Sequence, residues 1–152
     1  MLFGGRGKVE QVRPSGSATA AATRRDAVIM AVDDDATSRA AIIEILEEAG
    51  YQVHALSNYT DWDAAWRSGQ RPNLLVLDIM LSEPRRGGYE ILRSLRREDA
   101  QLPVVMVSSR NTPSDAAFAK ANSANAFVSK VQGEFGHPER GLVATVNRLL
   151  SS

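Results

Sequence analysis

Cysteine is absent from this chain of 152 residues, so disulfide bonds and thiolate metal sites are excluded. Histidine is scarce, because His54 and His137 are the only two, and their separation argues against a histidine-based metal site or phosphoryl donor. No apolar run approaches the roughly 20 residues that span a bilayer, and the N-terminus lacks the apolar centre of a secretory signal. We therefore expect a soluble, cytoplasmic protein without a membrane span.

A net charge is also missing, since 18 basic and 18 acidic residues cancel. Residues 1–25 nevertheless carry five basic residues against Glu10, which gives +4, and the rest of the chain is correspondingly −4. The first 25 residues are rich in Gly, Ser, Ala and Thr and show no hydrophobic periodicity. We predict a disordered basic tail over 1–25 and a single folded domain over 26–152, whose acidic balance argues against DNA as a partner.

Short apolar runs alternate with amphipathic stretches from residue 27 onward. The clearest amphipathic stretch places Ile42, Ile45 and Leu46 on one side of a helix that Gly50 ends. This alternation predicts an α/β domain, a doubly wound five-stranded parallel sheet with five helices on its two faces. The expected strands are Val28–Val32, Gln52–Leu56, Leu74–Leu77, Val104–Val107 and Ala126–Val128, and the later helices cover roughly Thr60–Arg67, Tyr89–Arg97, Ser114–Ala121 and Pro138–Leu150.

Reactive side chains follow four of these strands. The first ends in Asp33-Asp34-Asp35, the third in Asp78, the fourth in Ser108-Ser109 and the fifth in Lys130. Ligands of such sheets bind beyond the carboxyl ends of the strands, so these residues are expected to meet there. Clustered carboxylates favour a hard divalent cation, Mg²⁺ or Mn²⁺, while a lysine and a hydroxyl can stabilise charge on a phosphoryl group.

Each of these residues also has an ordinary structural explanation. Adjacent acids often cap a helix or lie in a solvated loop, Asp78 could cap its own loop, and Lys130 could simply end a strand. Their joint occurrence at four strand ends favours a phosphoryl-transfer site. Of the two serines, strand register favours Ser108 over Ser109.

The segments VIMAVDDDATSR, LLVLDIML, LPVVMVSS and AFVSK together resemble the bacterial response-regulator receiver family over residues 28–150. The resemblance implies a flavodoxin-like fold with strand order 2-1-3-4-5. It also implies that Asp33 and Asp34 are the paired acids of a Mg²⁺ site, that Asp78 is the phosphoacceptor and that the backbone carbonyl of Met80 is a further metal ligand.

The same resemblance implies that Ser108 is the switch hydroxyl, Lys130 the phosphate-binding lysine and Phe127 the switch aromatic. Phosphorylation in this family reshapes the face made by the fourth helix, fifth strand and fifth helix, which downstream proteins bind. Met80 and Arg110 stand where side chains influence access of water to the acyl phosphate. An apolar methionine offers water no hydrogen bond, so we predict slow self-dephosphorylation.

Two segments depart from the family pattern. Val131 replaces the usual proline after Lys130, and since a non-proline cis bond costs about 3 kcal/mol, we predict a trans bond. The following stretch, Val131–His137, is expected to be a long and loose connection. The segment from Leu81 to Gly88 replaces a shorter loop after the acceptor, which we expect to leave the acceptor itself unaffected.

Trp62 and Trp66 lie one helical turn apart in the second predicted helix. Core packing is the favoured interpretation, and an exposed aromatic patch for partner binding is the alternative.

The favoured function is a stand-alone receiver, not an enzyme beyond its own aspartyl phosphorylation and dephosphorylation, that takes a phosphoryl group from a histidine kinase or phosphotransfer protein and then binds a downstream protein. The segment SSRNTPSDAAF most resembles receivers of chemosensory systems that control motility. A phosphorylation-independent interaction module is the alternative. A haloacid-dehalogenase-type phosphatase is disfavoured because it requires a second acid where Met80 stands.

Overall fold

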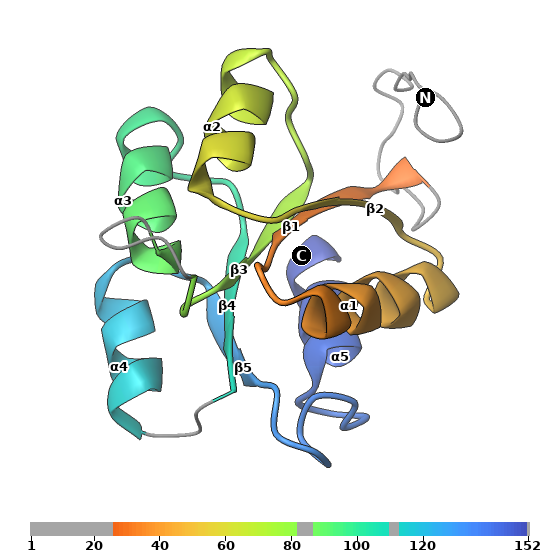
Figure 1. The fold of residues 1–152 in the computed structure, drawn as a ribbon. Coiled ribbons are helices and arrows are strands. Elements are labelled where there is room, and N and C mark those ends of the chain that lie inside the picture. The colour runs from red at the N-terminus through yellow and green to blue at the C-terminus, as the bar shows by residue number, and fades with distance from the viewer. Residues whose placement is uncertain (1–25, 82–86, 110–112, 152) are drawn as a thin grey trace.

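The computed structural model describes residues 26–81, 87–109 and 113–151, in which five strands alternate with five helices (Figure 1). The predicted tail over 1–25 and Arg110 lie outside these described residues. The elements are β1 (Val28–Val32), α1 (Ala36–Glu48), β2 (Gln52–Leu56), α2 (Tyr59–Arg67), β3 (Leu74–Asp78), α3 (Gly88–Glu98), β4 (Val104–Ser108), α4 (Pro113–Ala121), β5 (Ala126–Ser129) and α5 (Leu142–Leu150).

The strands form one parallel sheet in the order β2-β1-β3-β4-β5, which confirms the predicted fold class. After β1 the chain adds β2 on one side and then returns to add β3 on the other, so the order reverses between β1 and β3. Val32 pairs with Leu77 across this boundary. The residues that follow, Asp33 and Asp78, therefore lie side by side at the switch point where such sheets bind ligands.

Two hydrophobic cores cover the two faces of the sheet, because alternate strand residues point to opposite sides. Helices α1 and α5 cover one face, and helices α2, α3 and α4 cover the other (Figure 1). Ile42 and Leu46 of α1 pack with Val146 of α5 over the first face. Both tryptophans belong to the second core, with exposed fractions of 1% for Trp62 and 4% for Trp66. Their predicted core packing is confirmed, and the exposed aromatic patch is wrong.

Arg96 joins three segments at the amino-terminal edge of the sheet. Its guanidinium donates to the carbonyls of Ser123 (3.0 and 3.1 Å), Asp99 (3.1 Å) and Leu102 (2.8 Å) and to Asn125 Oδ1 (3.1 Å). Asn125 Oδ1 also accepts from the backbone N–H of Val104 at 2.8 Å. The end of α3, the start of β4 and the connection from α4 to β5 are thereby held together.

Helices α2, α3 and α4 begin and end within one residue of their predicted bounds, and α1 ends at Glu48 before Gly50, whose φ is +101°. The start of α5 differs, since Leu142 and not Pro138 begins the helix. The reason is a fold-back in which the carbonyl of Phe135 accepts from Leu142 N at 2.8 Å and that of His137 from Gly141 N at 2.9 Å. A side chain on Gly141 would meet Phe135 O at 2.4 Å, so this close approach requires glycine.

The connection after Lys130 is long, as expected, since α5 begins only at Leu142, but the expectation that it is loose is wrong. The carbonyl of Val131 accepts from both Glu134 N (2.9 Å) and Phe135 N (3.2 Å), and Arg140 Nε pairs with Glu134 Oε1 at 2.6 Å. The peptide bond between Lys130 and Val131 is trans, as predicted. In the described part of the chain, no helix has both the length and the apolar content needed to cross a bilayer.

Candidate functional site

Three carboxylates meet at the carboxyl-terminal edge of the central strands. Asp33 follows β1, with its N–H donated to Leu56 O of β2 at 3.0 Å, and Asp78 is the last residue of β3. Asp33, Asp34 and Asp78 can each place one oxygen within 4.8 Å of the others. Asp33 is fully buried and Asp78 is 4% exposed. Like charges at this separation and burial repel one another unless a cation lies among them.

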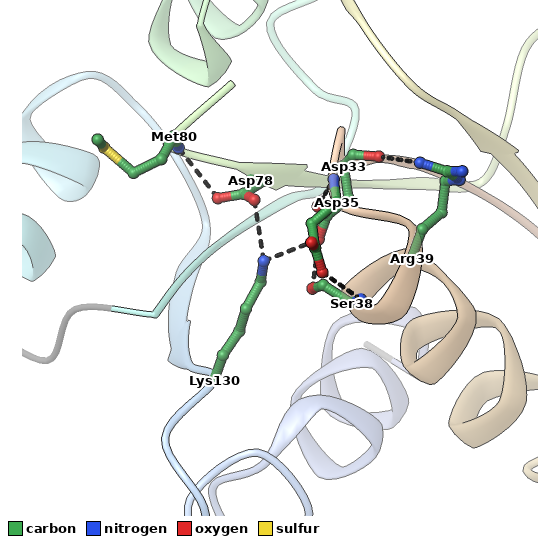
Figure 2. A network of polar contacts seen from close by, with 7 residues as sticks. All are labelled: Asp33, Asp35, Ser38, Arg39, Asp78, Met80 and Lys130. Carbon is green, nitrogen blue, oxygen red and sulfur yellow. Dashed lines mark hydrogen bonds and ion pairs between the residues drawn. The ribbon is translucent and has the colours of Figure 1, made fainter. Parts of the chain in front are cut away.

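Lys130 supplies one such cation. Its Nζ lies 2.7 Å from Asp33 Oδ2 and 2.9 Å from Asp78 Oδ2, so one ammonium bridges the two buried carboxylates (Figure 2). The backbone of Lys130 is fixed by its N–H, which donates to Ser108 O at 2.8 Å. The side chain therefore reaches across the edge of the sheet from β5 to β1 and β3.

Asp33 is held by further donors from the first turn of α1. Its Oδ1 accepts from Asp35 N at 2.9 Å, its Oδ2 from the Ser38 hydroxyl at 2.5 Å, and its carbonyl from Arg39 Nη1 at 2.8 Å (Figure 2). Asp35 is the N-cap of α1, because its Oδ2 accepts from Ser38 N at 2.7 Å. Sequence reasoning missed Ser38 and Arg39, although the spacing Asp-x-x-Ser of an N-cap before a helix could have drawn attention to the serine.

The two buried carboxylates differ in acidity. Burial raises the pKa of Asp78 to about 6, against the lowering effect of its hydrogen bonds from Lys130 and Met80 N. Burial acts in the same direction on Asp33, but hydrogen bonds from Lys130, Ser38 and Asp35 N outweigh it and lower its pKa. Burial lowers the pKa of Lys130, and its contacts with both carboxylates reverse this and raise it. Lys130 is therefore a cation at neutral pH, and Asp33 is an anion.

The residues present fit a hard divalent cation. Three carboxylates offer oxygen ligands within a small span, and Lys130 alone leaves this cluster with a surplus of negative charge. Asp33, Asp34 and Asp78 would hold a Mg²⁺ ion there. A bound Mg²⁺ would neutralise the carboxylates and draw negative charge from phosphoryl oxygens.

A family model described as the response regulator receiver domain matches residues 29–135, which is more than half of the chain. The chain belongs to the response regulator receiver family. Curated relatives agree with this assignment. The nitrogen assimilation regulatory protein NtrX of Azorhizobium caulinodans is 34% identical over 102 residues, 67% of this chain and 22% of NtrX. The transcriptional regulatory protein AfsQ1 of Streptomyces coelicolor is 35% identical over 106 residues, 69% of this chain and 45% of AfsQ1. The matched segment is thus less than half of either relative.

Solved structures agree with the receiver fold. NtrX from Brucella abortus, in complex with ADP, superposes with a TM-score of 0.71 at 27% identity, covering 82% of this chain and 27% of that one. The BeF₃-activated DrrB receiver domain gives a TM-score of 0.68 at 23% identity, with 83% and 98% coverage. The chemotaxis response regulator CheY4 of Vibrio cholerae gives 0.65 at 22% identity, with 81% and 98% coverage. The last two are likenesses of fold.

The other predicted site residues of this receiver that the structure describes lie on β4, on β5 and just after β3. Ser108 is buried at the end of β4, and Phe127 in β5 is half-buried against the core under α2, α3 and α4. The N–H of Met80 donates to Asp78 Oδ1 at 3.0 Å, and its side chain is 52% exposed. The roles of the Met80 carbonyl as a metal ligand, of Phe127 as the switch aromatic, and of Met80 and Arg110 in dephosphorylation stay predictions.

Gly88 brings the start of α3 against β3, the strand that ends in Asp78. A Cβ on Gly88 would lie 2.2 Å from the carbonyl oxygen of Asp78, and the backbone N–H of Gly88 donates to Ile79 O at 3.3 Å. No side chain fits at such an approach, so a glycine is required here. The backbone of Asp78 is thereby confined between β4 and α3.

Proposed function

We propose that this receiver accepts a phosphoryl group on Asp78, in a Mg²⁺- or Mn²⁺-dependent reaction, from the phosphohistidine of a histidine kinase or phosphotransfer protein. The observation that carries the proposal is the Lys130 ammonium, which bridges Asp33 and Asp78 beside a third carboxylate, Asp34. A buried carboxylate that retains a cationic neighbour can act as a nucleophile, and the same cation can stabilise the transferred group.

In the proposed step, a carboxylate oxygen of Asp78 forms a bond to phosphorus while the phosphorus–nitrogen bond of phosphohistidine breaks. The imidazole of the donor leaves with the electron pair. The Lys130 ammonium and the Ser108 hydroxyl donate hydrogen bonds to the phosphoryl oxygens and stabilise their negative charge, since both lie at the edge of the sheet that carries Asp78. Before the transfer, Asp33 is the second partner of Lys130.

The test is to incubate the protein with Mg²⁺ and acetyl phosphate and to measure intact mass. Wild type gains the mass of one phosphoryl group, and Asp78→Asn does not. Asp61→Asn, at an exposed aspartate of α2, is the matched control and labels like wild type. EDTA abolishes labelling. Labelling that persists in Asp78→Asn would assign the acceptor to another residue, and an unlabelled wild type would favour a phosphorylation-independent interaction module.

The output is proposed to be phosphorylation-dependent binding of a protein to the face formed by α4, β5 and α5. Pull-downs with and without the fluoride complex of beryllium would detect it. A stand-alone mode of action, a cytoplasmic location and a chemosensory pathway stay predictions, as does the absence of enzymatic activity on other substrates. The absence of DNA binding also stays a prediction, because the relative AfsQ1 is named a transcriptional regulatory protein.

A further inference from the structure

Ser38 contacts the carboxylate cluster from a position outside the strand ends. Its hydroxyl donates to Asp33 Oδ2 at 2.5 Å, the same oxygen that lies 2.7 Å from Lys130 Nζ. Figure 2 shows Ser38 and Lys130 approaching Asp33 from different elements, α1 and the end of β5. Ser38 is half-buried and Asp33 fully buried. Such a carboxylate depends on protein donors for its orientation.

Two side chains, Ser38 and Lys130, donate to the Asp33 carboxylate, and they differ in what else they bind. Lys130 is shared with Asp78, so any change at Asp78 alters what Lys130 can offer Asp33. The Ser38 hydroxyl is directed to Asp33, and its backbone is fixed because its N–H donates to the N-cap Asp35 at 2.7 Å. Ser38 can therefore keep Asp33 in place when Lys130 turns toward a phosphoryl group on Asp78.

We propose that Ser38 is a positioning residue for the metal site, whose hydroxyl holds the Asp33 carboxylate in its ligating orientation. The inference rests on the proposed function, because it assumes that Asp33 is a metal ligand. Hydrogen-bond partners of metal ligands fix ligand orientation, and their loss typically costs about 10-fold to 100-fold in metal affinity.

Ser38→Ala isolates the hydroxyl. The substitution keeps the backbone N–H that Asp35 caps, and alanine has the higher helix propensity, so α1 remains formed. Ser38→Thr keeps a hydroxyl at the same position and serves as the conservative rescue. Thr37→Ala changes an exposed side chain in the same helical turn and serves as the matched control.

The experiment measures Mn²⁺ binding to the unphosphorylated full chain from the electron paramagnetic resonance signal of free Mn²⁺. Ser38→Ala is expected to bind Mn²⁺ about 10-fold more weakly than wild type, and Ser38→Thr and Thr37→Ala within about 2-fold of it. Thermal unfolding of each variant confirms that the protein is folded during the titration. Equal affinities of wild type and Ser38→Ala, or a threonine variant as weak as the alanine variant, would overturn the inference.

The two proposals fail in different ways. If wild type binds Mn²⁺ and is phosphorylated on Asp78 while Ser38→Ala matches it, only the role of Ser38 is lost. If wild type binds no Mn²⁺, the metal-dependent function and the role of Ser38 are both overturned.

Discussion

Asp78 sits where an ionised side chain is costly. It is 4% exposed, and burial raises its pKa to about 6 although Lys130 lies 2.9 Å away. An aspartate in the unfolded chain has its pKa near 3.8. The native state therefore binds this proton more tightly than the unfolded state, and the contribution of Asp78 to stability falls as the pH rises from about 4 to 6.

Asp78→Asn should consequently stabilise the metal-free protein at neutral pH. The gain is up to about 3 kcal/mol at pH 7.5, because a difference of one in pKa corresponds to about 1.4 kcal/mol, and it shrinks as the pH falls from 6 toward 4. Urea unfolding in EDTA at pH 7.5 and pH 4.5 measures it, with Asp61→Asn as control. A gain that is the same at both pH values would contradict the role of the buried charge.

The strand-end residues were predictable from the sequence, and their separate roles were not. Asp33, Asp78 and Lys130 each follow an apolar run, so parallel topology alone brings them together. The three adjacent acids divide into the fully buried Asp33, the half-buried Asp34 and Asp35, which caps a helix. Which of the three acids is buried and which caps the helix depends on the direction in which α1 leaves the sheet, and the sequence pattern does not specify that direction. The contact from Ser38 depends on the same direction.

At the scale of elements, α3 approaches β3 closely through Gly88, where a Cβ would lie 2.2 Å from Asp78 O. Hydrophobic periodicity predicts that α3 exists and where it lies, but the distance between its first turn and a strand depends on backbone packing. The missed start of α5 has a similar cause. Pro138 is compatible with a first helical turn, and only the fold-back onto Phe135 and His137 places residues 138–140 in a turn instead.

Gly88→Ala should destabilise the receiver by about 1–3 kcal/mol, since the new methyl group would meet backbone atoms that cannot rotate away. Gly136→Ala is the control, because a Cβ there has nothing within 4 Å and its φ is not positive, and it should change stability by less than about 0.5 kcal/mol. Urea unfolding of both variants provides the comparison. Equal stabilities would show that α3 can shift away from Asp78 at no cost.

Across the whole molecule, the carboxyl and amino edges of the sheet contribute differently to stability. The carboxyl edge gathers buried like charges around Lys130, which costs stability, whereas the amino edge is tied together by Arg96. The parallel direction of the strands, which separates these edges, was predicted and is confirmed. The Arg96 contacts were not predictable, because they join loops whose paths the sequence pattern does not specify.

Arg96→Ala should lower the free energy of unfolding by about 2 kcal/mol, since the partly buried carbonyl contacts of Asp99 and Leu102 lose a charged donor. Phosphorylation of the folded protein on Asp78 should be retained, because Arg96 lies at the opposite edge of the sheet. Arg97→Ala, at an exposed neighbour on α3, is the control and should be near neutral. Urea unfolding and the acetyl phosphate assay measure the two effects. Loss of phosphorylation in folded Arg96→Ala would show that the edges are coupled.

The stacked tryptophans of α2 give this molecule a particular optical behaviour. Trp62 and Trp66 are the two indoles of the chain, their ring centroids are 6.0 Å apart, and both are shielded from water in the core under α2 and α3. Neither belongs to the cluster of Asp33, Asp78 and Lys130. Their emission should shift to longer wavelength when the core opens to solvent, so intrinsic fluorescence is suited to following denaturation, while cation occupancy at the sheet edge calls for a separate spectroscopic reporter.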